Sequence, residues 1–118
     1  ILYEAAQASV NKQDPFIIFT YSNDLYSLSG ELANELKYRN QQKAVIIGRK
    51  HEDKVIMSLR SEEQPILKAL ERALQNVDGY GGGHPKACGA VVAQKDFDAF
   101  IATFKETMFN SEGFPKRI

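Results

Sequence analysis

The sequence predicts a single α/β domain: a mixed, mostly parallel sheet of about four strands with helices packed on it. Short apolar runs typical of buried strands alternate with stretches whose apolar residues recur every three or four positions, as in helices. The length of 118 residues corresponds to about one domain, and no repeat or linker divides it.

The first half of the chain predicts a helix followed by a strand, helix, strand unit. Residues 1–12 have apolar positions at helical spacing. The runs 15–21 and 43–48, PFIIFTY and KAVIIG, are mostly apolar or aromatic without alternation, which is typical of strands covered on both faces. Between them, a leucine stripe over 25–36 follows capping side chains at 22–24. This order predicts a right-handed crossover between parallel strands.

The second half predicts a hairpin, two helices and a short strand. Residues 54–61, KVIMSLRS, follow the strand at 43–48 so closely that an antiparallel hairpin is expected. A glycine-rich loop precedes the short strand. The remaining predicted segments are helices at 66–74 and 97–108, the strand GAVVA at 89–93, and a frayed tail at 110–118.

Composition and charge limit the classes of partner. No apolar stretch approaches the roughly 18 to 20 residues of a membrane helix, so no membrane partner is expected. Fifteen basic and fifteen acidic side chains give a formal charge of zero, whereas proteins that grip long duplex DNA normally carry a basic excess. Any contact with nucleic acid is therefore expected to be local and short.

The single cysteine indicates a cellular compartment, and the first residue indicates that the chain is part of a longer polypeptide. One cysteine, Cys88, cannot form an internal disulfide, which fits a reducing compartment, and we expect a cytoplasmic protein. The sequence starts with Ile1 rather than Met. We therefore expect residues 1–118 to be the C-terminal part of a longer polypeptide.

The stretch 79–90, GYGGGHPKACGA, carries the main functional signal. Fixing glycine costs conformational entropy, so a glycine cluster indicates positive φ angles or a molecule pressed against the main chain. Successive backbone N–H groups in such a loop can form a nest that binds an anion, and His84 and Lys86 add cationic donors. These features predict a phosphate-binding site. The alternative is that the glycines only allow close packing and that His84 caps the turn.

Two common nucleotide-binding loops are excluded by context. A Rossmann loop follows a strand and opens a helix, whereas this glycine run follows a predicted helix and opens a strand. A Walker loop ends in Gly-Lys followed by Ser or Thr, which does not occur in this sequence. An anion site here therefore belongs to another class.

Two motifs together resemble a known family. GGGHPKACG, at 81–89, closely resembles the G-G-G-H-x-x-A-x-G signature of the DHH-associated C-terminal domain, which accompanies DHH phosphoesterases such as RecJ-like exonucleases and oligoribonucleases. SLRS, at 58–61, resembles a second motif of that family, one helix before the glycines. Where the family often has Ala-Ala-Gly, this chain has Cys88 in the middle position, and we expect it to pack as a small hydrophobe. The related C-terminal module of alanyl-tRNA synthetase generally departs from the Gly-Gly-Gly-His signature.

The resemblance implies a domain that holds substrate while a separate N-terminal domain cuts it. In a strand, Ser58 and Arg60 share a face, and a guanidinium suits phosphate or a base. Two alternatives stay open: Arg60 pairs with a surface carboxylate, and Ser61 caps the following helix together with Gln64. The predicted phosphate-binding residues are Ser58, Arg60, Ser61, Gly81, Gly82, Gly83 and His84, with Tyr80 and Lys86 as weaker candidates.

The family's hydrolytic chemistry, by resemblance, requires residues that this sequence lacks. It uses two divalent ions, manganese or magnesium, held by Asp and His ligands that include an Asp-His-His run. This chain contains only His51 and His84 and has no such run. We therefore predict no catalytic and no metal-binding residue here, and expect the metal in the N-terminal catalytic domain. The expected partners are that domain and a short single-stranded nucleic acid or nucleotide.

A second hypothesis is a scaffold domain that descends from such a nuclease and recruits partners in replication or repair. A basic or apolar surface patch elsewhere, together with a blocked glycine loop, would favour it. Tyr21, Tyr26 and Tyr38 are expected to pack in the core, although aromatic rings also stack on bases. Tyr80 differs because it lies in the glycine loop and could cover a bound base.

Overall fold

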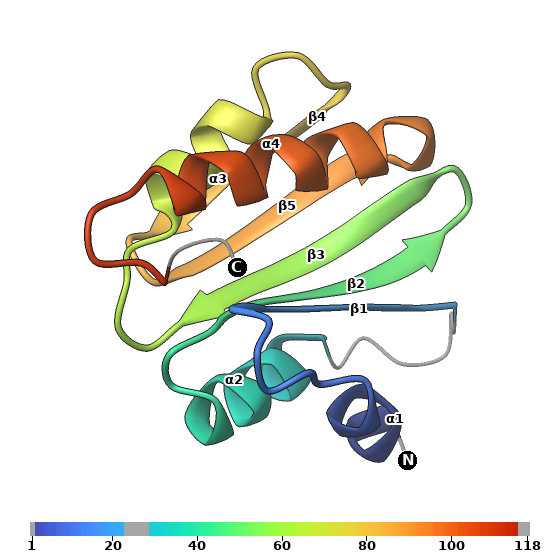
Figure 1. The fold of residues 1–118 in the computed structure, drawn as a ribbon. Helices are drawn as coiled ribbons and strands as arrows, with labels where there is room; N and C mark the ends of the chain where they lie inside the picture. Colours follow the sequence, from blue (N-terminus) through green and yellow to red (C-terminus); the bar gives the residue numbers. More distant parts are fainter. Residues whose placement is uncertain (1, 23–28, 116–118) are drawn as a thin grey trace.

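The structure, a computed structural model, describes residues 2–22 and 29–115, which form a five-stranded sheet with helices on both faces (Figure 1). The predicted α/β class is confirmed. A 3₁₀ turn, Gln94–Asp96, leads into the last helix. The elements are α1 Leu2–Ala8, β1 Phe16–Tyr21, α2 Ser29–Arg39, β2 Ala44–His51, β3 Lys54–Ser61, α3 Leu67–Ala73, β4 Gly79–His84, β5 Ala87–Ala93 and α4 Phe97–Phe109. None of the helices in the described part of the chain is long and apolar enough to cross a membrane.

The sheet is mixed, but the expectation of mostly parallel strands has to be corrected. The strand order is β1-β2-β3-β5-β4. Among the described strands, only β1 and β2 pair in parallel, joined by the predicted crossover through α2, and the other three pairings are antiparallel. Two residues separate β2 from β3, and two separate β4 from β5. Such short connections join only antiparallel strands, since a parallel pair needs a crossover of a dozen or more residues.

The fifth strand is the glycine segment, which was predicted to be a loop. β4 pairs antiparallel with β5, with Gly82 opposite Gly89 and His84 opposite Ala87. Glycine disfavours strands, so the local sequence gives little sign of this element. Pairing along β5 holds it in the extended conformation, at the outer edge of the sheet.

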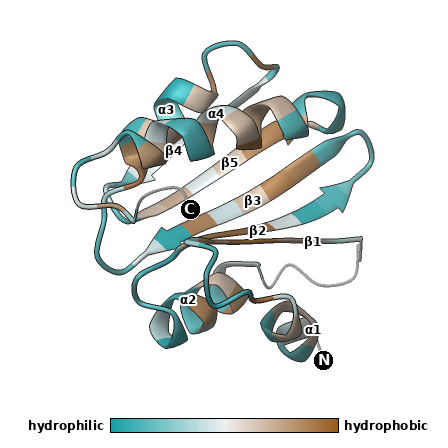
Figure 2. Ribbon diagram, in the orientation of Figure 1, coloured by the Kyte–Doolittle hydropathy of each residue, from teal (hydrophilic) through white to brown (hydrophobic). Residues whose placement is uncertain are grey.

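Two hydrophobic layers fill the space between the sheet and its helices. α3 and α4 cover one face and α1 and α2 the other (Figure 1). The larger layer contains Phe100 and Phe104 of α4, both fully buried against strand residues such as Leu59. The second contains Leu36 of α2 and Ile47 of β2. The strands between these layers are coloured largely hydrophobic in Figure 2.

The described part of the expected frayed tail, 110–115, is held to the core by Phe114. Phe114 is only 3% exposed, and its ring centroid lies 5.2 Å from that of Phe16 on β1. Phe109, the last residue of α4, approaches the same Phe16 ring at 5.3 Å. The chain up to Phe114 therefore belongs to the folded domain, and residues 116–118 lie outside the described part.

The helix α2 packs mainly on β2 and β3. Leu32 and Leu36 of the predicted leucine stripe are buried, and positions 23–28 of that prediction, Tyr26 included, lie outside the described residues. Tyr21 is in the core as expected. Tyr38 is 73% exposed, so its predicted core position is wrong: two residues after Leu36, it points away from the sheet.

Candidate functional site

A surface formed by β3, β5 and β4 lies on the sheet face opposite to α3 and α4, and α2 borders it along β3. Residues directly opposite each other on neighbouring strands project to the same face. We call this surface the shelf. It consists of three rows. The first is Arg60, Ala87 and His84, which we call the cationic row because it contains the Arg60 guanidinium; the middle row is Ser58, Gly89 and Gly82; and the apolar row is Ile56, Val91 and Tyr80. Neighbouring rows are about 6.6 Å apart, because they are two strand residues apart.

The middle row is nearly free of side chains. A Cβ atom added at Gly82 would meet no heavy atom of the described chain within 4 Å. At Gly89, the nearest atom would be the Met57 oxygen at 3.6 Å, an ordinary contact distance. Neither glycine has a positive φ angle. Neither packing nor backbone conformation therefore requires glycine at these two positions.

The other glycines of β4 are required by the fold. A Cβ at Gly79, Gly81 or Gly83 would lie 2.5 to 2.6 Å from a backbone oxygen of β5, and Gly83 also has φ of 145°. Only glycine permits such a close approach of two strands. For these three residues, the structure agrees with the alternative given in the sequence analysis, namely that the glycines allow close packing.

The predicted nest of N–H groups is not present in β4. The Ala93 amide donates to the Asp78 carbonyl over 2.8 Å, which fixes the alternation of hydrogen bonds along the hairpin. By that alternation, the polar backbone groups of Gly82 and His84 point toward β5, and those of Gly81 and Gly83 point to the outer edge. Successive N–H groups of an extended strand thus diverge, so they cannot converge on one anion.

Arg60 is held in place by neutral partners. Its Nε donates to Oδ1 of Asn34 on α2 at 3.0 Å. Its Nη1 donates to the carbonyl oxygens of Leu59 at 2.9 Å and Cys88 at 2.8 Å. No carboxylate among the described residues pairs with Arg60, in contrast to the alternative given in the sequence analysis. Among the described residues, these three acceptors fix the guanidinium without neutralising its charge.

The remaining group of Arg60, Nη2, lies at the first turn of α2. A Cβ at Gly30 would be 3.6 Å from Nη2 and 3.9 Å from the Ser58 hydroxyl, so glycine leaves space beside both. Among residues 2–22 and 29–115, Nη2 has no hydrogen-bond partner. Within that part of the chain, the two N–H groups of Nη2 are the donors that an anion on the shelf would meet.

The two predicted serines lie on opposite faces of the sheet. The Ser58 hydroxyl is on the shelf, 3.1 Å from the hydroxyl of Ser29, the first residue of α2. Ser61 is 4% exposed on the other face, and its hydroxyl donates to the Gln64 carbonyl. Ser61 does not cap α3, because that helix begins at Leu67 and its N-cap residue, Ile66, has no side-chain cap hydrogen bond. Ser61 is also not brought together with the other candidates.

His84, Lys86 and Tyr80 are exposed, at different distances from Arg60. His84 is in the same row as Arg60, with Ala87 between them, so the two Cα atoms are about 10 Å apart. Lys86 is in the turn between β4 and β5, outside the three rows. An anion above Ala87 would lie between the arginine and the histidine.

Cys88 is buried beneath the shelf, as predicted. Its thiol donates to the His84 carbonyl at 3.0 Å, and burial raises its pKa above the ordinary value. A protonated, buried thiol is a poor nucleophile and a poor metal ligand. In the described part of the chain, no three His, Cys, Asp or Glu side chains lie close enough together to hold a metal ion.

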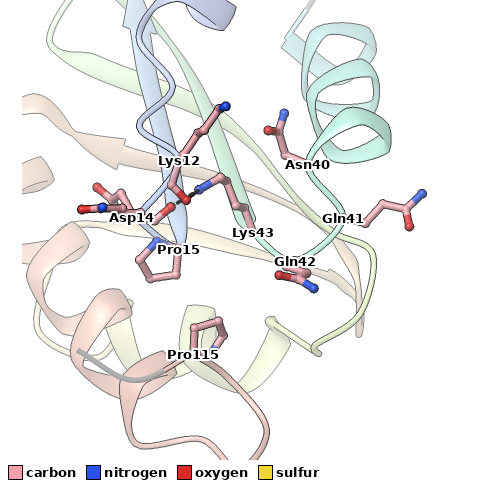
Figure 3. A pocket seen from close by; sticks show the side chains of 9 residues that line it. Lys12, Asp14, Pro15, Asn40, Gln41, Gln42, Lys43 and Pro115 are labelled. Carbon is pink, nitrogen blue, oxygen red and sulfur yellow. Dashed lines mark hydrogen bonds between the residues drawn. The ribbon is translucent and has the colours of Figure 1, made fainter. Parts of the chain in front are cut away.

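A separate pocket of about 320 Å³ lies where β1 and β2 begin (Figure 3). The Lys43 ammonium extends into the loop before β1 and donates to the carbonyl oxygens of Asn11 at 2.9 Å, Lys12 at 3.2 Å and Asp14. Burial lowers the pKa of Lys43. Since an ammonium has three protons, these bonds leave no donor for a ligand, and Lys43 stabilises the loop.

Sequence reasoning missed Asn34 and Gly89 as parts of the site. Asn34 lies 26 residues before Arg60, and its role depends on how α2 packs on β3. Gly89 belongs to the glycine motif and lies two residues from both Ala87 and Val91. Since alternate residues of a strand share a face, a strand assigned to this segment would have predicted that Gly89 lies on the same face as these two residues.

The fold and the two motifs define an α/β domain of the kind that accompanies phosphoesterases. The family described as "DHHA1 domain" matches residues 26–110. The chain belongs to this family, which confirms the resemblance found in the sequence.

Solved structures with the same fold include two RecJ proteins and a synthetase domain. RecJ from Thermus thermophilus in complex with Mg²⁺ is 18% identical, with a TM-score of 0.76 over 99% of this chain and 18% of that chain. Exonuclease RecJ bound to manganese is 17% identical, with a TM-score of 0.76 over 98% of this chain and 28% of that chain. The C-Ala domain of Aquifex aeolicus alanyl-tRNA synthetase is 18% identical, with a TM-score of 0.60 over 77% of this chain and 86% of that domain.

At these identities, the similarity concerns the fold. The chain spans less than a third of the length of either RecJ structure. No curated protein sequence matches the chain closely enough to add to the comparison.

Proposed function

We propose that this chain is the substrate-holding domain of a DHH-family phosphoesterase and that the shelf binds the phosphate of a short single-stranded nucleic acid or nucleotide. The observation that carries the proposal is Arg60, positioned by neutral partners beside a middle row that has no fold-related need for glycine. A charged, preoriented guanidinium next to accessible backbone is suited to phosphate.

Hydrolysis belongs, in this proposal, to a catalytic domain N-terminal to this one. The described residues offer no cluster of metal ligands, whereas the RecJ structures that share the fold contain Mg²⁺ or manganese. Two-metal hydrolysis needs several ligands around both ions. The proposal therefore places manganese or magnesium in the other domain, which is also the partner of this one, in a cytoplasmic enzyme.

A blocked glycine segment, together with a surface patch elsewhere, would favour the scaffold hypothesis. Tyr80 and His84 are exposed, and among the described residues the side-chain direction at Gly82 is open. These observations support ligand binding at the shelf over a purely structural role.

The test is an NMR titration of the 118-residue chain with a nucleoside monophosphate and with a short oligonucleotide. We expect amide shifts at Gly82, Gly89, Arg60 and His84. Replacing Arg60 or His84 by alanine is expected to weaken binding by about 1 to 3 kcal/mol, the range for charge-assisted hydrogen bonds.

Arg72→Ala is the matched control for Arg60→Ala. Arg72 is an exposed arginine on α3, which covers the opposite face of the sheet. Equal weakening by both variants would mean that binding reflects overall charge. Shifts confined to residues outside the shelf would place the ligand elsewhere and overturn the proposal.

A further inference from the structure

The apolar row of the shelf presents an exposed aromatic ring. Tyr80 is 70% exposed; of the large hydrophobic side chains in the described part of the chain, only Tyr38 is comparably exposed. Beside Tyr80, in the same row, lie Val91 and Ile56, which are half-buried. The ring therefore stands exposed at the end of a half-buried apolar floor.

The three rows differ in chemistry along the direction of β4. Tyr80, Gly82 and His84 occupy alternate positions of the strand, so they share a face at intervals of about 6.6 Å. An aromatic position is followed by a position without a side chain and then by a position flanked by cationic groups. Across the strands, by contrast, the cationic row has Arg60 at one end and His84 at the other.

A nucleotide has the same succession of parts: a flat base, a sugar, and an anionic phosphate. Lying along β4, it would meet an aromatic ring, a gap and a cationic row in matching order. Lying across the strands in the cationic row, it would use Arg60 or His84 for its base and leave only the other residue for its phosphate, and its base would not reach the Tyr80 ring. The lengthwise orientation is therefore the one that pairs each part with complementary chemistry.

We infer that the shelf binds one nucleotide lengthwise, with the base stacked on Tyr80, the sugar over Gly82 and Gly89, and the phosphate between Arg60 and His84. The inference rests on the proposed phosphate site and adds a base platform to it. Stacking uses the π-face that every base has, so the platform accepts all four bases, with preferences that follow stacking strength.

The experiment compares adenosine 5′-monophosphate with ribose 5-phosphate, which has the same phosphate and sugar but no base. Affinities for the 118-residue chain are measured by calorimetry, and the Tyr80 ring and shelf amides are followed by NMR. We expect the nucleotide to bind about tenfold more tightly than ribose 5-phosphate, with upfield shifts of the Tyr80 ring protons.

Three variants separate stacking from other effects. Tyr80→Ala is expected to lower nucleotide affinity about tenfold and leave ribose 5-phosphate affinity unchanged. Tyr80→Phe keeps the ring and is expected to bind like the wild type. Tyr38→Ala removes an equally exposed tyrosine from α2, outside the shelf, and is expected to have no effect.

The outcomes distinguish this inference from the proposed function. If ribose 5-phosphate binds as tightly as the nucleotide and shifts the cationic row, the base platform is wrong and the phosphate site stands. If Tyr38→Ala and Tyr80→Ala weaken the nucleotide equally, the platform is not Tyr80. If neither ligand shifts Arg60 or His84, the phosphate site fails, and the inference fails with it.

Discussion

The two faces of the β4–β5 hairpin are under different constraints. Toward α3 and α4, Cys88, Ala90 and Val92 are buried, and the glycines at 79, 81 and 83 are sterically required. On the shelf, Gly82 and Gly89 have no such requirement. Because side chains alternate along a strand, one uninterrupted glycine run is divided into residues that maintain the fold and residues that leave space on the surface.

The largest expected effect is on stability, from a substitution on the hairpin face toward α3 and α4. Gly81→Val is expected to lower the free energy of unfolding by about 2 to 3 kcal/mol, because its Cβ would lie 2.5 Å from the Gly89 backbone oxygen and the strands would have to separate. Urea unfolding followed by circular dichroism measures this change. A stability equal to that of the wild type would mean that the close approach of β4 to β5 is not a constraint.

The neighbouring residue is expected to respond in the opposite way. Gly82→Val adds the same side chain where space is open, and valine favours strands, so the free energy of unfolding is expected to stay within about 1 kcal/mol of wild type. Affinity for a nucleoside monophosphate is expected to fall about tenfold, or about 1.4 kcal/mol, because the side chain fills the middle row. Calorimetry on the folded variant measures this loss.

Either of two results would contradict the division between these glycines. A Gly82→Val variant that binds nucleotide like the wild type would show that the shelf is not the binding surface. A variant that unfolds like Gly81→Val would show that Gly82 also serves the fold. The pair differs by one position and carries the same substitution, so each variant is the control of the other.

Much of this fold could be predicted from the sequence, because periodicity reports which face of an element is buried. The strand at 54–61 was predicted with the bounds that β3 has, and α4 ends one residue after its prediction. The same period-two argument placed Ser58 and Arg60 together on one face, as the structure does. These features depend on residues near one another in the chain.

The features that could not be predicted depend on distant pairing. β4 is a strand because β5 lies beside it, although its own residues disfavour that conformation. Asn34 orients Arg60 because α2 packs on β3, and the sequence of neither segment predicts this contact. Which glycines are required likewise follows from the approach of the neighbouring strand.

The smallest expected effect concerns Cys88, which points from the hairpin into the core, beside Gly89 of the shelf. Burial raises the pKa of its thiol above 9.0 in the folded chain. Between 9.0 and that higher value, the unfolded chain loses the proton and the folded chain keeps it, so stability falls as pH rises. The wild type is therefore expected to lose up to about 1.4 kcal/mol per pH unit relative to Cys88→Ala above about pH 9. Parallel urea-unfolding profiles of the two proteins between about pH 7.5 and about 10 would show that the thiol ionises equally in both states, and hence that the core face of the hairpin is open to water like the shelf.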